Sequence, residues 1–528
     1  MLPIVPSQQQ QPQPSFRDFI RKDRINRRWL VGATIATLTQ LVLFKIFYPY
    51  ASYFFTDSFA YIYAAASNLD ANVWPVGYSK FLRVFNTFLH PDLALVSFQY
   101  LFLQFSGFYF LTTLLYIFRP GKVATGTLWI FFTFQPVFLY IANSVSSDAL
   151  FIGLSLIWIT RLIMMMDRPT RREIVLQALL VTAMFTIRYN AMIYPLVAAL
   201  AILLSKYSLR QKWIAIALPV IGILVFIGYT GQVTKEISGV RSYSPFSGWQ
   251  IANNALYMYG HIKEETPPPA RFKGLDSTVR QYLGKQRYYH TLYDSVYPGI
   301  FFLWSPHSPL VQYMGQQRKK DTGAAYFRSW AAVSPLYADY GSWLIKQYPG
   351  DFAQYWLWPN LVRYALPPLE FMDRYNSGMD TVDVVAKYWF HYKDNKVSAF
   401  SAKFQHHLLA GYPLLCLLGN GFFLGMTALF FTTRGVAGAN PLFRNYVLVI
   451  TALWTTHFLF SIAAAPVVLR YQVFLLLLNF SSSLLLVECL LKWDKARTEH
   501  TTTSDEKDQH TGGKLRFRLD SLVGVRGG

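Results

Sequence analysis

Cysteine and charged residues are both scarce in this chain of 528 residues. Its two cysteines, Cys416 and Cys489, lie in apolar runs, which excludes a disulfide framework and a Cys-x-x-Cys metal site. Charged residues make up 15% of the chain, against about 25% in ordinary soluble domains. Apolar residues make up 53%, and a soluble fold would have to expose many of them. Most of the chain is therefore expected to lie in a bilayer.

Acidic residues are also few, because 28 Asp and Glu stand against 49 Lys and Arg, for a net charge of +21. A basic excess can indicate nucleic-acid binding. Here the cations gather in the short segments between apolar runs, on the side where the positive-inside rule expects them. We therefore attribute the excess to membrane topology and expect no nucleic-acid partner.

The apolar runs predict an all-α polytopic membrane protein with about ten transmembrane helices. The first run follows six cations and lacks a signal-peptide cleavage site, so it reads as an uncleaved anchor with a cytoplasmic N-terminus. Two later runs, 174–187 and 191–205, are short; they form either a pair that dips from one side or two spans completed by flanking residues. The predicted spans are 29–48, 93–118, 123–141, 149–166, 174–187, 191–205, 213–229, 408–431, 446–465 and 467–491.

Two stretches are expected on the extracytoplasmic side, the first outer loop 50–92 and the block 231–405. The block is polar, rich in Tyr, Trp and Pro, and has no spanning run. With about 175 residues it can bury a core of its own, so we expect a mixed domain inserted between the seventh and eighth spans. The predicted parts are a disordered basic cytoplasmic N-terminus (1–28), a first transmembrane part (29–230), the extracytoplasmic domain (231–405), a second transmembrane part (406–491) and a disordered cytoplasmic tail (492–528).

Two acids stand at the expected extracytoplasmic ends of spans. Asp57 follows the first span, and Asp148 opens the fourth. Each can be only a helix cap, since carboxylates are favoured at helix N-termini. The functional alternative is that Asp57 acts as a general base on a hydroxyl, and that Asp57 and Asp148 share a divalent cation, Mg or Mn.

Two arginines lie on the side where the positive-inside rule does not need them. Arg188 is at the tip between the two short runs, and Arg470 is at the start of the last span. Snorkelling can place an arginine at an interface, but two guanidinium groups at this rim also suit a phosphate group. Lys80, in the amphipathic stretch 75–83, can join them or contact only lipid headgroups.

In this order and on one side, the motifs resemble the integral-membrane glycosyltransferases of the GT-C superfamily, in particular the protein O-mannosyltransferase and aminoarabinose-transferase branches. The resemblance covers 29–230 and 408–491. Relatives carry two consecutive acids where this chain has Asp57-Ser58, and the Trp-Trp-Asp signature of oligosaccharyltransferases is absent, which argues against transfer of a large glycan to asparagine. The matching stretches are Asp57-Ser58-Phe59-Ala60-Tyr61, Gly77-Tyr78-Ser79, Ser147-Asp148-Ala149-Leu150-Phe151, Arg188-Tyr189-Asn190 and Arg470-Tyr471.

The resemblance implies an enzyme that moves a sugar from a polyprenyl-phosphate lipid to an acceptor hydroxyl of a glycan, lipid or protein. The active site would face the extracytoplasmic side, of a bacterial inner membrane more readily than of the endoplasmic reticulum. The resemblance implies that Asp57 is the catalytic acid of the first loop. From the residue chemistry we expect Asp148 to be the second catalytic residue, which orients an acceptor or a metal, and Arg188, Arg470 and Lys80 to bind phosphate. Supporting roles are expected for Tyr61, Tyr78, Tyr189 and Tyr471.

Two other classes of protein compete with this interpretation. A transporter or flippase of a lipid-linked molecule would also use arginines at the rim, but it predicts charged or broken helices near the midplane and an internal repeat. A membrane scaffold would leave the acids and arginines unexplained. The candidates gather at one face, which favours an enzyme. We therefore expect Asp57, Asp148, Arg188 and Arg470 to line one cavity.

Overall fold

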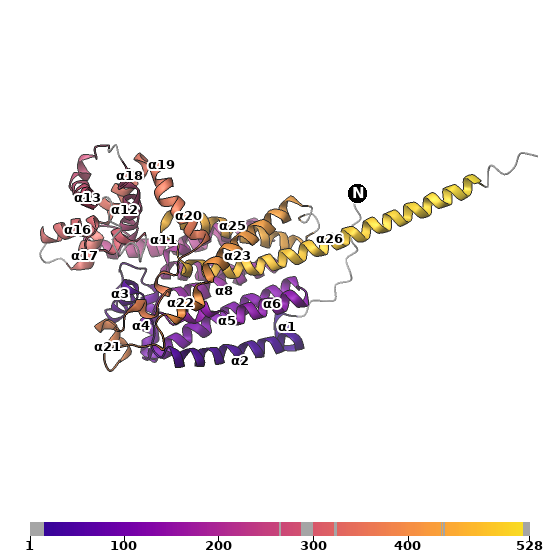
Figure 1. The fold of residues 1–528 in the computed structure, drawn as a ribbon, viewed down its shortest axis with the longest axis horizontal. Helices are drawn as coiled ribbons and strands as arrows, with labels where there is room; N and C mark the ends of the chain where they lie inside the picture. The colour runs from indigo at the N-terminus through magenta and orange to yellow at the C-terminus, as the bar shows by residue number, and fades with distance from the viewer. Residues whose placement is uncertain are drawn as a thin grey trace, which may run out of the picture.

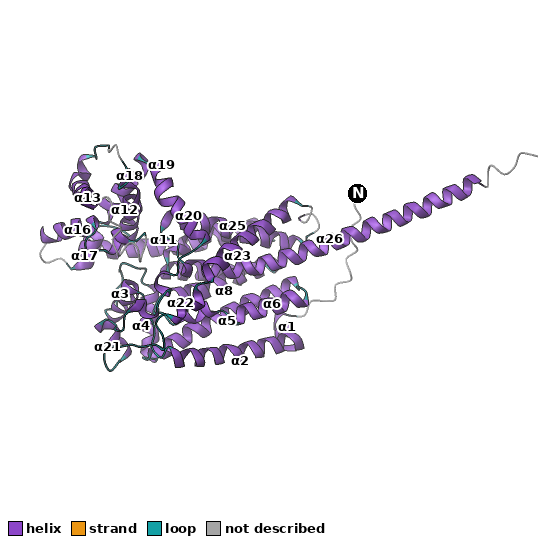
Figure 2. Ribbon diagram, in the orientation of Figure 1, coloured by secondary structure: helices purple, strands orange, loops and turns teal. Residues whose placement is uncertain are grey.

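The computed structural model describes residues 15–262, 266–286, 299–320, 325–433, 436 and 439–520, and their regular structure is helical (Figure 1; Figure 2). Pairing of β type is limited there to two isolated bridges, Ser52 with Ser144 and Thr381 with Lys396. The all-α prediction is confirmed. The expectation of a mixed domain in block 231–405 is wrong, because the aromatic segments of its described part pack as helices around buried rings.

Eight helices or helix pairs in the described part are long and apolar enough to cross a membrane. Figure 1 shows them running roughly along one axis as a bundle. The predicted total of about ten consists of these eight and the two short runs. The eight are α2 (Arg24–Phe47), α5 (Asp92–Phe118), α6 with α7 (Lys122–Thr133 and Pro136–Ala142), α8 (Asp148–Asp167), α11 (Leu209–Ser238), α22 with α23 (Phe404–Leu409 and Tyr412–Thr432), α25 (Pro441–Ala464) and the first part of α26 (Leu469–Asp520).

The two short runs form a hairpin that is as deep as α8. At one end the Tyr207 hydroxyl donates to the carbonyl of Thr170, which joins the base of the hairpin. At the other end Arg188 pairs with Asp148, the first residue of α8. Because the hairpin runs the length of a spanning helix, the structure favours two spans over a shallow dip. Its helices are α9 (Arg171–Ile187), η1 (Tyr189–Ile193) and α10 (Tyr194–Leu204).

Helices α5, α8 and α26 form the centre of the bundle. Their apolar windows are 67, 72 and 67% buried, whereas that of α2 is 17% buried and that of α25 is 22% buried. The peripheral helices keep their apolar side chains exposed, as helices do where they face lipid. The central position of α8 and α26 matters because both carry candidate site residues at their first turn.

The block after α11 is a small helical domain at one end of the bundle, which we call the domain end (Figure 1). Because α11 continues to Ser238 and α22 begins at Phe404, the domain comprises 239–403 and not 231–405. The Asn254 side chain ties it to the bundle by donating to the carbonyls of Ala463 and Ala464. Its helices are α12 (Pro245–Tyr259), η2 (Ala270–Phe272), α13 (Lys273–Gln286), α15 (Phe301–Trp304), α16 (Pro309–Lys320), α17 (Tyr326–Ala332), α18 (Ser334–Gln347), α19 (Pro349–Phe352), η3 (Ala353–Leu357), α20 (Trp358–Ala365), η4 (Glu370–Met372), η5 (Tyr375–Gly378) and α21 (Val384–Phe390).

The loop between α2 and α5 lies at the same end and contains α3 (Phe55–Ala66) and α4 (Gly77–Phe88). A short helix before α2, α1 (Phe16–Lys22), lies at the opposite end of the bundle. The two ends of the bundle therefore differ: one carries both large connecting segments, and the other carries short turns.

Both predicted disordered ends are helical where the structure describes them. In α1, Phe16 and Phe19 pack their rings edge-on or tilted against Tyr116, which anchors residues that the composition alone marks as a polar arm. Helix α26 continues past its apolar part to Asp520, since no proline interrupts it, and projects from the bundle (Figure 1). The prediction of disorder also covered 1–14 and 521–528, which lie outside the described residues.

The domain depends on close packing of α12 against α18 at two glycines. A Cβ at Gly248 would stand 2.1 Å from the carbonyl oxygen of Ser334, and one at Gly341 would stand 2.7 Å from that of Ile251. Backbone atoms cannot move aside cheaply, so G248A is expected to destabilise the protein by about 1–3 kcal/mol through overpacking. Thermal unfolding in detergent measures the loss. G350A is the matched control because nothing lies within 4 Å of that position; equal effects of the two substitutions would contradict the packing argument.

Candidate functional site

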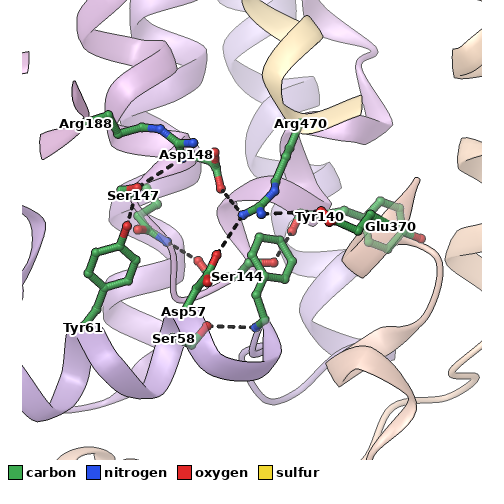
Figure 3. A network of polar contacts seen from close by, with 12 residues as sticks. Asp57, Ser58, Tyr61, Tyr140, Ser144, Ser147, Asp148, Arg188, Glu370 and Arg470 are labelled. Carbon is green, nitrogen blue, oxygen red and sulfur yellow. Dashed lines mark hydrogen bonds and ion pairs between the residues drawn. The ribbon is translucent and has the colours of Figure 1, made fainter. Parts of the chain in front are cut away.

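Four predicted residues meet in a buried ion-pair cluster at the domain end (Figure 3). Arg188 Nη1 pairs with Oδ1 of Asp148. Arg470 Nη1 donates to Oδ2 of Asp57 and to Oδ2 of Asp148, at 3.3 Å in both cases. Four side chains from α3, α8, the end of α9 and α26 are thereby joined. They meet in direct contact, as a packed cluster instead of the lining of an open cavity.

Backbone contacts before α3 and α8 explain how Asp57 comes to lie beside Asp148. Ser52 N–H donates to the carbonyl of Asn143 at 2.8 Å, and Val145 N–H donates to the carbonyl of Ser52 at 3.0 Å. This short parallel pairing holds the two segments together just before their helices begin. Both acids then lie in the first turn of their helices, but neither is the N-cap, because α3 begins after Phe54 and α8 after Ser147, and neither helix has a side-chain cap hydrogen bond.

The structure adds a third carboxylate, Glu370, that the sequence interpretation missed. Its Oε2 lies 3.5 Å from Arg470 Nη2, and this buried oxygen accepts no hydrogen bond from the described residues. Glu370 opens η4 with a φ of 52°, in the left-handed region that residues other than glycine rarely adopt. The backbone of this loop is fixed to α26 because Leu469 N–H donates to the carbonyl of Pro368 at 2.9 Å. The available sequence signal was a lone acid in the apolar stretch 366–372.

The cluster contains more acids than bases, so its charge depends on protonation. Burial raises the pKa of Glu370 to about 7; Arg470 opposes the rise, and Asp57 and Asp148 add to it. Burial also raises the pKa of Asp57, against the opposing charge of Arg470. With both aspartates ionised, two guanidiniums and three carboxyls give a net charge of zero when Glu370 is protonated and −1 when it is ionised. The cluster is therefore poised to change charge near neutral pH.

Tyr471 lies between the two arginines. The guanidinium carbon of Arg188 is 5.0 Å from its ring centroid and that of Arg470 is 4.9 Å away. The rings of Phe54 and Phe371 also approach Arg470, at 4.9 and 5.5 Å. Cation–π contacts of this kind stabilise desolvated cations. The rings cover the faces of the guanidinium of Arg470, and its edge is left for anionic oxygens.

The other predicted tyrosines lie progressively farther from the charges. The Tyr61 hydroxyl is 3.1 Å from Ser147 Oγ, which accepts a hydrogen bond from Arg188 Nη1 at 3.2 Å. Tyr78 packs its ring edge-on against Tyr61 and donates to the side chain of Gln99. The Tyr189 hydroxyl donates to a carbonyl of the segment that precedes α12. Tyr61 thus belongs to the network, whereas Tyr78 and Tyr189 support its surroundings.

Lys80 does not join the cluster. Its Nζ pairs with Asp70 at 2.6 Å and also donates to both oxygens of Asn68. Helix α4 buries the face that carries Tyr78 and Leu82, so Lys80 is directed to the preceding loop. The expectation that Lys80 shares a phosphate with Arg188 and Arg470 is therefore corrected.

The acids of the cluster are engaged by guanidinium groups and not by each other. A cation between Asp57 and Asp148 would have to displace Arg470, because both present their Oδ2 atoms to it. Within the described residues, no group of three or more His, Cys, Asp and Glu side chains has an arrangement that could hold a metal ion. The shared divalent cation stays a prediction without geometric support.

The pH dependence of stability offers a test of the buried state of Glu370. The pKa of Glu370 rises from 4.5 to about 7 on folding. The stabilisation of the folded state by its protonated carboxyl is therefore fully present below pH 4.5 and is lost as pH rises through 7. The free energy of unfolding is expected to fall by about 1 kcal/mol between pH 6 and 8.5 from this group. Unfolding in mixed SDS micelles measures the fall, which should shrink in E370Q. An unchanged fall in E370Q would place the titration elsewhere.

Comparison with known proteins gives one match, to a family described as a predicted membrane protein (DUF2142), over residues 102–264. The matched stretch contains Asp148 and Arg188, whereas Asp57, Glu370 and Arg470 lie outside it. No curated protein and no solved structure matches the chain. The family match and the eight apolar helices of the described part together identify an integral, multi-pass membrane protein.

Proposed function

We propose that the protein is a glycosyltransferase that moves a sugar from a polyprenyl-phosphate donor to an acceptor hydroxyl at the extracytoplasmic face of the membrane. The observation that carries the proposal is the ion-pair cluster. It joins residues of α3, α8, α9 and α26 at the domain end, where the apolar length of α8 and α26 begins. A lipid-borne phosphate would reach that level with its isoprenoid chain still in the bilayer.

The reaction needs a base and a cation, and the cluster offers both. The acceptor oxygen attacks C1 of the sugar, the bond from C1 to the phosphate oxygen breaks, and the phosphate leaves with the electron pair. A carboxylate must take the acceptor proton, and cations must stabilise the charge that develops on the phosphate. Asp57 is the better placed base, because its side chain is 14% exposed and that of Asp148 is 4% exposed.

Asp148 serves in this proposal to orient the two arginines. It contacts Arg188 through one carboxylate oxygen and Arg470 through the other, so it fixes the positions of both guanidinium groups. Tyr471 fixes their faces. Two cations held in this way can donate hydrogen bonds to the two non-bridging oxygens of a phosphodiester, and preorganised donors of this kind stabilise developing charge.

The domain 239–403 is the proposed site of acceptor selection. Its loop 366–372 reaches into the cluster through Glu370 and Phe371, so an acceptor would approach along this loop. Several of its Trp rings, among them Trp249, Trp330 and Trp356, are buried in its core. Exposed Trp358 is a better candidate for contact with a ligand.

A transfer assay tests the proposal against the alternative of a transporter or flippase. The purified protein in nanodiscs is given a panel of polyprenyl-phosphate sugars that carry a radiolabel in the sugar, together with sugar, lipid and peptide acceptors. Transfer moves the label from the lipid to the acceptor phase, whereas flipping leaves the glycosidic bond intact. If the label remains on the lipid with every donor, and the donor moves between leaflets in vesicles, the proposed glycosyltransferase activity is rejected and the transporter or flippase is supported.

A further inference from the structure

Glu370 is held in the cluster less well than its neighbours. Asp57 and Asp148 each accept a hydrogen bond from Arg470, whereas Glu370 contacts it only as an ion pair at 3.5 Å. Its Oε2 is buried and accepts no hydrogen bond within the part of the chain that the structure describes, and its backbone is in the left-handed region. Buried carboxylates without donors are costly, and left-handed backbone at a non-glycine residue is typical of strain kept for function.

Arg470 itself keeps donor capacity that the three carboxylates do not use. Its Nε is buried and has no hydrogen-bond partner among the described residues, although the side chain is surrounded by acids. Its Nη2 faces Glu370 at a distance too long for a good hydrogen bond. The Nε and Nη groups of a guanidinium form a fork that matches two oxygens of a phosphate. The unused Nε donor and the Nη2 group that faces Glu370 thus belong to the same guanidinium of Arg470.

We propose that Glu370 is a place-holder for the phosphate of the lipid-linked donor: its carboxylate occupies the edge of Arg470 that the phosphodiester takes when the donor binds. The ligand class rests on the proposed function. When Glu370 is ionised, binding exchanges one anion for another, so the net charge around Arg470 does not change. Glu370 leaves either with a proton or by movement of loop 366–372, and its backbone is then free to give up the left-handed conformation.

The proposal makes donor binding depend on pH through Glu370, whose charge state is set by burial and by the charged groups that face it. These are Arg470 on α26, Asp57 on α3, Asp148 on α8 and Arg363 on α20. Above neutral pH the ionised Glu370 competes with the phosphodiester for Arg470. Below it the protonated Glu370 competes weakly. A phosphodiester keeps a charge of −1 throughout, so any change in affinity between pH 6 and 8.5 comes from the protein.

Binding of a methyl polyprenyl phosphodiester to the full chain in nanodiscs tests this exchange without requiring catalysis. We expect E370Q to bind the probe about tenfold more tightly than the wild type at pH 8.5. The wild type should gain about tenfold in affinity from pH 8.5 to 6, and E370Q should change less than twofold. D373N is the matched control, because Asp373 is a partly exposed acid three residues farther along that pairs with His406, and it should bind as the wild type does. A polyprenyl methyl ether, which has no charge, should show no dependence on residue 370.

Equal or weaker binding of the phosphodiester by E370Q at pH 8.5 overturns the proposal, as does failure of every form to bind the probe. E370Q is nearly isosteric, and its unfolding curve shows whether it is folded. The two proposals fail in different ways. If E370Q binds the probe more tightly but the protein transfers no sugar, the proposed enzyme activity is rejected and the phosphate subsite is supported. If the protein transfers sugar but E370Q binds the probe as the wild type does, the proposed role of Glu370 is rejected and the enzyme activity is supported.

Discussion

Substitution of Asp57 by Asn is expected to lower the rate of sugar transfer by about 10²–10⁴-fold, the usual contribution of a positioned general base. An amide of the same size cannot take the acceptor proton, although it still fits beside Arg470. The loss should appear in kcat, because proton transfer is assigned to Asp57 and the phosphate contacts are assigned to the arginines. Radiolabel transfer from the lipid donor at saturating donor concentration gives the rate.

The pH profile adds a second readout for Asp57. Burial raises its pKa, and only the ionised carboxylate can accept a proton, so the rate of the wild type should rise with pH through that pKa. D70N is the control, since Asp70 is a half-exposed acid of the same loop that pairs with Lys80. If D57N transfers sugar as fast as D70N does, Asp57 is not the base.

Removal of the Arg470 side chain is expected to produce the largest loss of stability. R470A would leave Asp57, Asp148 and Glu370 close together, with Arg188 as the cation left in the cluster. Breaking a buried ion pair by removing one partner costs about 3–5 kcal/mol, because the remaining charge stays buried. Unfolding of the purified variant in mixed SDS micelles measures this difference.

Lowering the pH should partly restore the stability of the R470A variant. Without the guanidinium, the pKa values of Asp57 and Glu370 rise further, so both carboxyls are protonated in the folded state as pH falls and their mutual repulsion is lost. The gap to the wild type should therefore narrow from pH 8 to 5.5. R271A removes an exposed pair with Asp339 and is expected to cost about 0–1 kcal/mol at either pH. A loss in R470A no larger than in R271A would mean that the cluster does not hold the bundle together.

Much of the fold could be predicted because it follows from local composition. A run of apolar residues as long as 93–118 is unfavourable in water, so it predicts a spanning helix whatever surrounds it. The same reasoning failed in the block 231–405, where buried Trp249 and Trp330 belong to helices of 15 and 7 residues, which are too short to be found as spanning runs. It also failed for the tail, since a polar composition does not exclude the continued helix of α26.

The candidate site was predicted in part for a similar reason. Asp57, Asp148, Arg188 and Arg470 were found because polar groups at the ends of apolar runs are few. Lys80 was predicted on a different ground, as a cation of the amphipathic stretch 75–83, and the loop before α4 supplies it with a partner in Asp70. Glu370 lies in the inserted domain and away from the ends of the spanning runs, so this criterion did not find it, although it is a lone acid in the apolar stretch 366–372.

The sequence by itself determined which segments are long and apolar enough to enter a membrane and which charged side chains stand at their ends. The tertiary structure alone decided which of those side chains touch. Asp57 and Arg470 are 413 positions apart, and their contact depends on the packing of α8 and α26 in the bundle centre and on the pairing of Ser52 with Ser144. An ion pair forms only where two side chains come within a few ångströms of each other, whereas the hydropathy of a segment depends on that segment alone. Sequence patterns therefore show which segments are apolar but not which charged side chains pair.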